Sequence, residues 1–212
     1  MRERWSRGYV KVCGVTTVEN ARDVVALGVD AIGVNLATSP RQVTPREARS
    51  ILDATQGSVL RCGVFADNED DEISGFVSDL AFDVVQLHGP LSPALHDDLR
   101  RRGAHIVKAL NIESAEFAAF DDSLVDAVLV DGPRPGSGSE HSWDGLATRA
   151  FRVPVIAAGG LTPSNVASVI AATKAWGVDS ASGVESRPRL KDLRLVKEFV
   201  DSARTAWREQ GE

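Results

Sequence analysis

The sequence predicts an α/β protein that folds as one (βα)8 TIM barrel. Short β-branched apolar runs alternate with amphipathic segments of helix length from one end of the chain to the other, which is the pattern of βαβ units and a parallel sheet. Eight runs are found, and eight parallel strands can close a barrel, whereas a doubly wound sheet would have fewer strands and a glycine-rich turn after the first. We therefore expect a single domain over residues 1–212, with short connections.

The expected strands are short apolar runs bounded by polar residues or glycine. They are Tyr9–Val15, Ala31–Leu36, Val59–Phe65, Asp83–Leu87, Ile106–Leu110, Ala127–Asp131, Val153–Ala158 and Val178–Ser180. In a barrel, the carboxyl ends of all the strands open on one shared pocket. The residues that follow these runs are therefore the candidates for chemistry.

Helix boundaries are marked by threonine and glycine. The segments Thr16–Glu19 and Thr44–Glu47 each place a Thr before an expected helix and a Glu three residues later, a pattern that predicts reciprocal capping of the first turn. Gly28 and Gly177 each precede an expected strand and predict a glycine at the end of the preceding helix.

The sixth helix is the weakest of the series. Gly132–Gly138 is rich in Gly and Pro, and only Trp143–Ala150 has helical character. A long loop after the sixth strand is therefore a candidate lid over the pocket.

Composition and charge exclude several classes of protein. A net charge of −6 and a pI near 5.3 argue against nucleic acid as a partner, and Arg100–Arg102 is interpreted as a solvated helix end. No stretch approaches about 18 apolar residues, and no apolar segment follows Met1–Trp5, so we expect a cytoplasmic protein without a membrane partner. Cys13 and Cys62 should then be reduced thiols, and a monomer is the favoured state.

Two neighbouring loops have the features of a phosphate site. Gly159-Gly160 follows the seventh expected strand and Ser182-Gly183 follows the eighth. Glycines allow the backbone to approach a ligand closely, and barrels commonly hold a phosphate on N–H groups at this position. A tight turn at Gly159-Gly160 is the alternative, but it does not account for the second glycine loop.

Cys13 and Asp131 are the candidates for proton transfer. Most buried cysteines act as small hydrophobes, so Cys13 alone would be weak evidence. Asp131, however, ends an apolar run and must be solvated, paired or functional. A thiol and a carboxyl group across one pocket can move protons in opposite directions.

Arg41 and His88 are candidates for substrate binding. Arg41 follows Pro40, and a guanidinium on such a loop can hold a carboxylate through two hydrogen bonds; a solvent-facing Arg is the alternative. His88 either contacts substrate or satisfies a buried backbone carbonyl group, and we assign it no proton-transfer role. Asn35, Asp67, Asn68 and Asn111 complete the polar residues at the strand ends.

Seven segments, in order along nearly the whole chain, carry a family resemblance. They are Lys11–Thr16, Ser39–Arg41, Gly63–Phe65, Asp83–Gly89, Leu129–Asp131, Ala158–Leu161 and Ser182–Glu185. Read together, they resemble phosphoribosylanthranilate isomerase, a barrel of the ribulose-phosphate-binding type that acts in tryptophan biosynthesis. The Lys-x-Cys-Gly opening, the Gln-Leu-His-Gly strand end and the Ser-Gly-Val-Glu loop are the most specific of these motifs.

The resemblance implies an aldose–ketose isomerase that needs no cofactor and no metal. It would convert N-(5'-phosphoribosyl)anthranilate into 1-(o-carboxyphenylamino)-1-deoxyribulose 5-phosphate by an Amadori rearrangement. Asp131 would be the general acid, Cys13 the general base and Arg41 the partner of the anthranilate carboxylate, with phosphate on the Gly160 and Ser182-Gly183 loops. Alternatives are a related barrel that isomerises another phosphoribosyl amine and a non-catalytic barrel that binds phosphosugars.

Departures from the family lie around the aromatic end of the substrate. Where the family usually has aromatic residues after the second strand, this chain has Ala37 and Thr38. Pro90 and Gly132 stand where an acidic and a hydroxyl residue are usual. We therefore expect a smaller apolar surface for the ring and a weaker KM.

Overall fold

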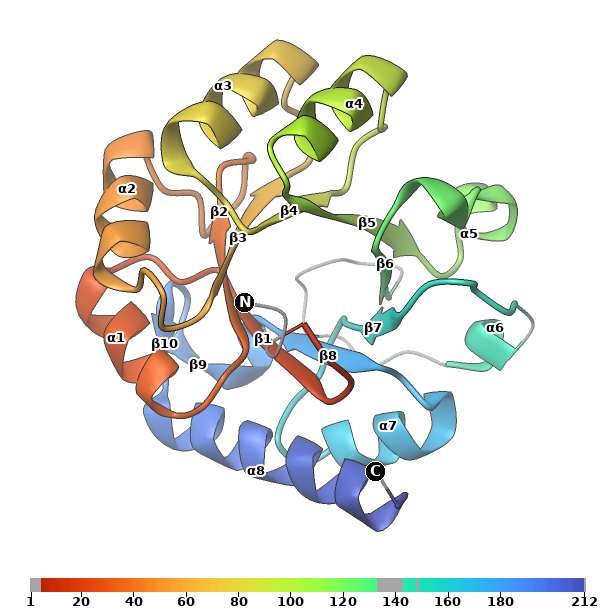
Figure 1. Cartoon of the computed structure of the whole chain (residues 1–212). Coiled ribbons are helices and arrows are strands. Elements are labelled where there is room, and N and C mark those ends of the chain that lie inside the picture. Colours follow the sequence, from red (N-terminus) through yellow and green to blue (C-terminus); the bar gives the residue numbers. More distant parts are fainter. Residues whose placement is uncertain (1–4, 133–142, 148, 212) are drawn as a thin grey trace.

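The computed structural model describes residues 5–132, 143–147 and 149–211. Eight parallel strands form a closed barrel in sequence order, surrounded by helices (Figure 1). The strands are β1 (Tyr9–Cys13), β2 (Ala31–Asn35), β3 (Leu60–Phe65), β4 (Val84–Leu87), β5 (His105–Asn111), β6 (Ala127–Asp131), β7 (Val155–Ala157) and β8 (Gly177–Ser180). The predicted fold class and all eight predicted strands are thus confirmed, with ends that differ by at most two residues.

Helices follow the strands around the outside of the barrel (Figure 1). They are α1 (Val18–Ala26), α2 (Pro45–Ala54), α3 (Asp70–Leu80), α4 (Pro93–Arg101), α5 (Ala115–Ala119), α6 (Asp144–Ala147), α7 (Val166–Thr173) and α8 (Leu193–Glu209), with 3-10 turns η1 (Asp122–Leu124) and η2 (Ser182–Val184). A two-stranded antiparallel hairpin, β9 (Glu185–Arg187) and β10 (Leu190–Lys191), lies between β8 and α8. The candidate lid after β6 falls mostly outside the described residues.

One of the two predicted capping boxes is confirmed and the other is wrong. The Thr44 side chain accepts from the N–H of Glu47, and the Glu47 side chain accepts from the N–H of Thr44. At α1, by contrast, the cap is Thr17, which accepts from the N–H of Asn20. Thr16 instead donates its hydroxyl hydrogen to the Arg189 carbonyl oxygen (2.7 Å). Its side chain is therefore bonded to the hairpin β9–β10 and does not cap the helix.

The two glycines predicted to end helices also differ in outcome. Gly28 follows α1 with φ of +84°, as predicted. Gly177 is instead the first residue of β8, and the residue that caps the end of α7 is Lys174, with φ of +55°. Glycine is required at 177 for another reason, because a Cβ there would lie 2.9 Å from the Tyr9 carbonyl oxygen on the neighbouring strand.

The apolar core has two parts, one inside the barrel and one between the barrel and its helices. Alternate residues of each strand point inward and outward, which separates the two sets. The inner set includes Tyr9, Cys62, Val84, Val107 and Leu129. The outer set is larger and includes Val10, Ile32, Phe65, Ile106, Val130 and Phe199. This packing fixes which strand residues can reach a pocket at the barrel mouth.

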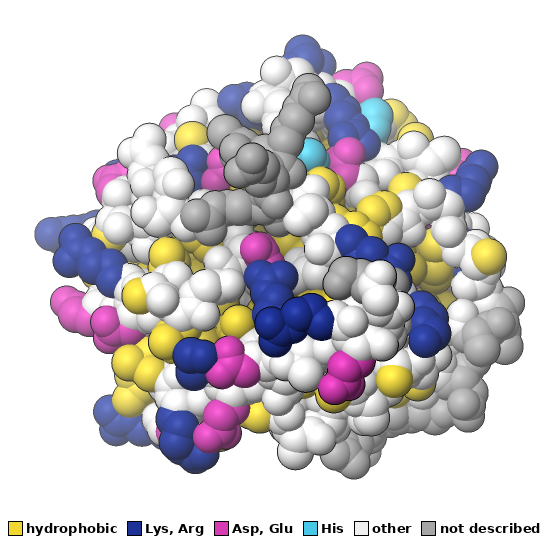
Figure 2. Space-filling view, turned by 60° about the horizontal axis from the view of Figure 1, so that its bottom comes forward, with side chains coloured by type: hydrophobic (Ala, Val, Ile, Leu, Met, Phe, Trp, Pro, Cys, Tyr) yellow, Lys and Arg dark blue, Asp and Glu magenta, His cyan; other side chains and the backbone are white. Residues whose placement is uncertain are grey.

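Charges are dispersed over the surface. Arg100 and Arg101 lie in the last turn of α4, as predicted, and Arg100 pairs with Asp126. Figure 2 shows Lys and Arg side chains lying next to Asp and Glu side chains on the face it presents. Among the described residues, no helix combines the length and the apolar composition needed to span a bilayer.

Candidate active site

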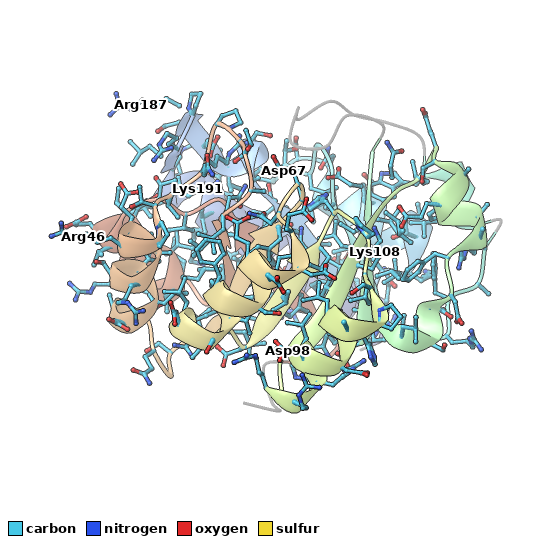
Figure 3. The ribbon with its side chains drawn as sticks, turned by 90° about the horizontal axis from the view of Figure 1, so that it is seen from above. Arg46, Asp67, Asp98, Lys108, Arg187 and Lys191 are labelled. Atoms are coloured by element: carbon cyan, nitrogen blue, oxygen red, sulfur yellow. The ribbon has the colours of Figure 1, made fainter. Side chains whose placement is uncertain are left out.

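A cavity of about 350 Å³ opens at the carboxyl ends of the barrel strands. Every residue singled out from the sequence for catalysis or binding lies on its wall: Cys13, Arg41, His88, Asp131, Gly159, Gly160, Ser182 and Gly183. Of the other polar strand-end residues, Asn35 lines this cavity, while Asp67, Asn68 and Asn111 are not part of its wall. In the side view of Figure 3, Asp67 and Lys191 lie toward this end of the barrel and Asp98 lies toward the other.

Cys13 is the last residue of β1 and is 8% exposed. Its thiol donates to Oδ1 of Asn35 at 3.5 Å. Burial raises the pKa of the Cys13 thiol, and the nearby Lys11 ammonium opposes this rise. The next residue must be glycine, because Gly14 has φ of +74° and a Cβ there would lie 2.3 Å from the Arg41 side chain.

Asp131 is the last residue of β6 and is 7% exposed. Its Oδ1 accepts the N–H of Gly132 at 2.8 Å. Burial raises the pKa of Asp131 to about 6, and the negative charge of Asp179 adds to the rise. The group therefore titrates close to neutrality, which suits a residue that gives up a proton.

Arg41 forms a two-pronged ion pair with Glu185. Its Nε and Nη2 atoms donate to the two carboxylate oxygens, each at 2.8 Å. Hydrogen bonding to Glu185 raises the pKa of Arg41, and Ser39 fixes the loop by accepting the Arg41 N–H. Glu185 occupies only one edge of the guanidinium. Among the residues that the structure describes, no acceptor is bonded to Nη1, so the edge formed by Nη1 and Nη2 is available to a ligand.

His88 is held as a neutral ring. Its Nε2 lies 2.9 Å from Nε2 of Gln86. That amide nitrogen can only donate, so His88 Nε2 accepts and the proton of the neutral ring is on Nδ1. Burial lowers the pKa of His88 to about 4, and the Lys11 and Lys108 charges add to the effect. The hydrogen-bond partner of the ring is thus a side chain rather than a backbone carbonyl, and the absence of a proton-transfer role for His88 stays a prediction.

The two glycine loops are adjacent in space as well as in type. Gly159 and Gly160 have φ of +86° and +69°, and Asn165 holds the turn by donating to the Gly160 carbonyl at 2.9 Å. A Cβ at Gly183 would lie 1.9 Å from the Leu161 carbonyl oxygen, so only glycine allows the loops after β7 and β8 to meet. Within the part of the chain that the structure describes, the N–H groups of Gly159 and Gly160 donate to no other residue.

Comparison with known proteins identifies the family. The sequence model described as "N-(5'phosphoribosyl)anthranilate (PRA) isomerase" matches residues 10–202. An N-(5'-phosphoribosyl)anthranilate isomerase of Geobacter sp. (strain M21) is 37% identical over 92% of this chain and 97% of its own. The crystal structure of phosphoribosyl anthranilate isomerase from Thermus thermophilus has 34% identity and a TM-score of 0.80, covering 93% of this chain and 98% of its own.

A third relative carries a ligand. It is a phosphoribosyl anthranilate isomerase in complex with reduced 1-(o-carboxyphenylamino)-1-deoxyribulose 5-phosphate, with 30% identity, a TM-score of 0.81, and coverage of 93% of this chain and 98% of its own. Matches of this length and identity decide the assignment. This chain belongs to the phosphoribosylanthranilate isomerase family.

Two charged residues near the site of this phosphoribosylanthranilate isomerase family member, Lys11 and Asp179, were not predicted from the sequence. Lys11 and Asp179 form a buried ion pair at 2.9 Å between β1 and β8, where the barrel closes. Asp179 also lines the cavity, and its Oδ1 has no hydrogen-bond partner among the described residues. The signal was present, because Lys11 stands two residues before Cys13 and so points to the same side of the strand.

Lys108 is a third buried charge that sequence reasoning did not single out. Its ammonium group donates to the carbonyl groups of His88 and Gly89, at 3.2 and 3.0 Å, and pairs with Glu116 at 2.9 Å. It therefore fixes the backbone just after β4 and, with it, the position of the His88 ring. No spacing rule predicts this contact, since β5 reaches it from the neighbouring strand.

Proposed function

We propose that this chain catalyses the Amadori rearrangement of N-(5'-phosphoribosyl)anthranilate to 1-(o-carboxyphenylamino)-1-deoxyribulose 5-phosphate. The observation that carries the proposal is the placement of Cys13 and Asp131 on one cavity wall, at the ends of β1 and β6. Around the barrel, β7 and β8 lie between these two strands, so the glycine loops lie between the two proton-transfer groups. A phosphosugar anchored on those loops would present its reacting carbons to both.

Asp131 is assigned the role of general acid. Its proton goes to the ring oxygen of the sugar, the bond from that oxygen to C1' breaks, and the nitrogen lone pair forms a protonated Schiff base with C1'. The raised pKa of Asp131, about 6, keeps a protonated fraction available near neutrality. The group ends the step as a carboxylate.

Cys13 is assigned the role of general base. As a thiolate it takes the proton from C2', and the electrons of that bond neutralise the iminium to give an enolamine. The enolamine becomes the ketose when C1' gains a proton and the 2'-hydroxyl group loses one, so the net change is an isomerisation. Because burial raises the pKa of Cys13, the ionised form is the minor one, and the Lys11 charge favours it.

Binding is assigned to the two ends of the cavity. Backbone N–H groups of Gly159, Gly160, Ser182 and Gly183 would hold the phosphate. Arg41 would bind the anthranilate carboxylate through the edge that Glu185 leaves open. Ala37 and Thr38 line the same wall and offer an aromatic ring little apolar surface, so a weaker KM than is usual for the family is expected.

The decisive experiment follows the decay of substrate fluorescence with purified protein and N-(5'-phosphoribosyl)anthranilate. Turnover by the wild type, together with a loss of about tenfold to a hundredfold in kcat/KM for Arg41→Ala, is the expected result. An analogue without the carboxylate should be insensitive to Arg41→Ala. A wild type that binds phosphate but does not turn over would instead favour a related phosphoribosyl amine as substrate, or a binding barrel without activity.

A crystal soaked with substrate, phosphate or sulfate tests the anchoring end. We expect the anion on the loops after β7 and β8; an anion bound reproducibly elsewhere at the barrel mouth would contradict the assignment.

We further propose that the protein is a monomer and that it acts in the cytoplasm. Only Leu124 and Leu193 are exposed among the large hydrophobic residues described, and both cysteines are free thiols, as a reducing compartment would keep them.

A further inference from the structure

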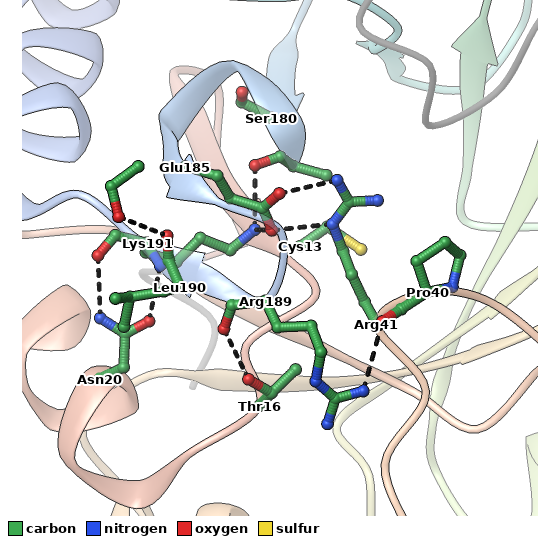
Figure 4. A network of polar contacts seen from close by, with 12 residues as sticks. Cys13, Thr16, Asn20, Pro40, Arg41, Ser180, Glu185, Arg189, Leu190 and Lys191 are labelled. Atoms are coloured by element: carbon green, nitrogen blue, oxygen red, sulfur yellow. Dashed lines mark hydrogen bonds and ion pairs between the residues drawn. The ribbon is translucent and has the colours of Figure 1, made fainter.

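The hairpin β9–β10 holds the loop that carries Arg41 (Figure 4). Arg189, in the turn of the hairpin, donates to the carbonyl groups of Pro40 and Gln42, which flank Arg41 on either side. Glu185, on β9, takes one edge of the Arg41 guanidinium. The hairpin therefore fixes both the backbone and the side-chain direction of Arg41.

Lys191 completes this cluster from the opposite side of Glu185. It is paired with Glu185 across the hairpin, and its ammonium group donates to Oε1 of Glu185 at 2.8 Å and to the Ala181 carbonyl at 2.9 Å. The Lys191 side chain is fully buried, Glu185 is 5% exposed and Arg41 is 11% exposed. One buried carboxylate thus lies between two cations, and only the Arg41 end reaches the cavity.

Lys191 determines the net charge of the cluster that it forms with Arg41 and Glu185. Arg41 and Glu185 alone would be a neutral ion pair, which offers an incoming anion little net attraction. With Lys191 the cluster carries one excess positive charge, and in a poorly solvated site that charge acts over several ångströms. Burial lowers the pKa of Lys191, and its contact with Glu185 opposes the change.

Lys191 acts through Glu185 and does not itself reach the ligand. Asn20 holds its backbone on both sides, accepting the Lys191 N–H at 2.9 Å and donating to its carbonyl group at 3.2 Å. The ammonium group, held by Glu185 and Ala181, is not part of the cavity wall. Its position is therefore fixed in the empty site as well as in an occupied one.

We propose that Lys191 is a specificity-determining, positioning residue that keeps the Arg41–Glu185 pair net positive, so that the open Arg41 edge selects substrates whose amine-derived part carries a carboxylate. The inference takes the identity of the carboxylate from the proposed function. The charge balance of Arg41, Glu185 and Lys191 comes from their contacts in the structure and does not depend on that proposal. It predicts that selectivity follows the net charge of the cluster rather than the presence of any one of its hydrogen bonds.

The test compares N-(5'-phosphoribosyl)anthranilate with N-(5'-phosphoribosyl)aniline, which lacks the carboxylate. For Lys191→Met we expect the ratio of the two kcat/KM values to fall about tenfold, through KM for the anthranilate compound. The Lys191 charge also lowers the pKa of Cys13, so a loss of kcat from this cause should be the same for both substrates and cancel in the ratio. The double variant Lys191→Met/Glu185→Gln restores the excess positive charge, so its ratio should return to within about threefold of wild type. Lys197→Met, which removes an exposed lysine of α8, is the control for overall charge and should leave the ratio unchanged.

Two further measurements separate a loss of charge from a loss of folding, and a failure of this inference from a failure of the proposed function. Lys191→Gln removes the charge but keeps a donor for Glu185 and Ala181, so it should lose selectivity as Lys191→Met does, whether or not the latter folds well. Affinities for the reduced product analogue, with and without its carboxyl group, report selectivity even if no variant turns over, and so separate this inference from the proposed function. A ratio unchanged in Lys191→Gln, or a folded double variant no better than the single one, would overturn the charge-balance role.

Discussion

The chain places its two thiols in similar surroundings but gives only one of them access to the cavity. Cys13 lines the cavity wall, whereas Cys62 is fully buried inside the barrel, where burial raises its pKa to about 12. We predict that Cys13→Ala lowers turnover by at least about 10², because the base is removed. Cys62→Ala, the matched control, should keep kcat while losing some stability. Nearly full activity in folded Cys13→Ala would make that thiol structural.

The pH dependence follows from the opposite demands on Asp131 and Cys13. The reaction needs Asp131 protonated and Cys13 ionised, although the pKa of Asp131 is about 6 and that of Cys13 lies above its usual 9.0. The product of the two fractions is constant between these values and falls about tenfold per pH unit outside them. We predict that kcat/KM is flat above a break near pH 6 and declines below it, since further acidification removes thiolate without adding acid.

The substrate phosphate also titrates near pH 6, so the break needs a control. The residual activity of Asp131→Asn supplies it. A break that belongs to Asp131 should vanish in this variant, and kcat/KM should then rise with pH until Cys13 is ionised. A break that persists belongs to the substrate phosphate, and Asp131 would not be the acid.

Asp131 should also cost the folded protein stability. An Asp carboxyl group has a pKa of 3.8 in the unfolded chain, whereas that of Asp131 is about 6 in the folded protein. Ionisation of Asp131 therefore costs more free energy in the folded state than in the unfolded one. The cost is absent below about pH 3.8, grows as the pH rises and is complete above about pH 6, where it reaches at most about 3 kcal/mol. We predict that Asp131→Asn raises the free energy of unfolding at pH 7.5 and that the gain shrinks by pH 4.5. An equal gain in urea unfolding at both pH values would contradict this origin.

At this scale, the sequence predicted residues at strand ends but not the pairs they form. Cys13, Arg41 and Asp131 were found because a barrel brings the ends of all its strands to one mouth. The partner of Arg41 is Glu185, 144 positions away, and Lys11 meets Asp179 across 168 positions. Such pairs depend on strand register and on how the loops pack, and neither is encoded in local spacing.

At the scale of secondary structure, alternation was enough to place every strand, while single capping residues were less dependable. Thr16 and Thr17 both had the chemistry of a cap, and the choice between them depends on a hairpin more than 160 residues later, whose Arg189 carbonyl group accepts from Thr16. Gly177 was misjudged because its reason is contact with Tyr9, not a helix end. Local rules hold where nothing distant competes for the residue.

The capping box of α2 is local in this sense and can be tested alone. Thr44→Ala removes the acceptor for the Glu47 N–H and should lower the free energy of unfolding by about 0.5–2 kcal/mol. Activity at a temperature well below the melting point should stay unchanged, because neither residue lines the cavity. Ser50→Ala, on the same helix, is the control, since the one partner of the Ser50 hydroxyl group in the described part of the chain is the Arg46 carbonyl of its own helix. Equal losses in both variants would show that the cap is not the cause.

For the whole molecule, the seam between β1 and β8 joins the two ends of the chain. The Lys11–Asp179 pair lies within it, and α8 covers it from outside. The Trp207 indole on α8 donates to the Ala175 carbonyl at 3.0 Å, and the Arg204 guanidinium donates to the Gly8 carbonyl. The site depends on this closure, because Cys13 and the loop after β8 are brought together only when the last strand meets the first.

Phe199, fully buried on α8, tests whether the seam and the site unfold together. Phe199→Ala leaves a cavity under α8 and should cost about 3–5 kcal/mol, a large share of the stability of a domain of this size. Because the barrel has no free edge, we expect one cooperative transition in urea, with far-UV circular dichroism and turnover lost at the same denaturant concentration. The control is Leu193→Ala, since Leu193 is exposed at the start of the same helix and should shift the midpoint little. If turnover in Phe199→Ala were lost at a clearly lower urea concentration than the helical signal, the β1–β8 seam would open as a separate unit. The active site would then depend on the pairing of β1 with β8, while the rest of the fold would not.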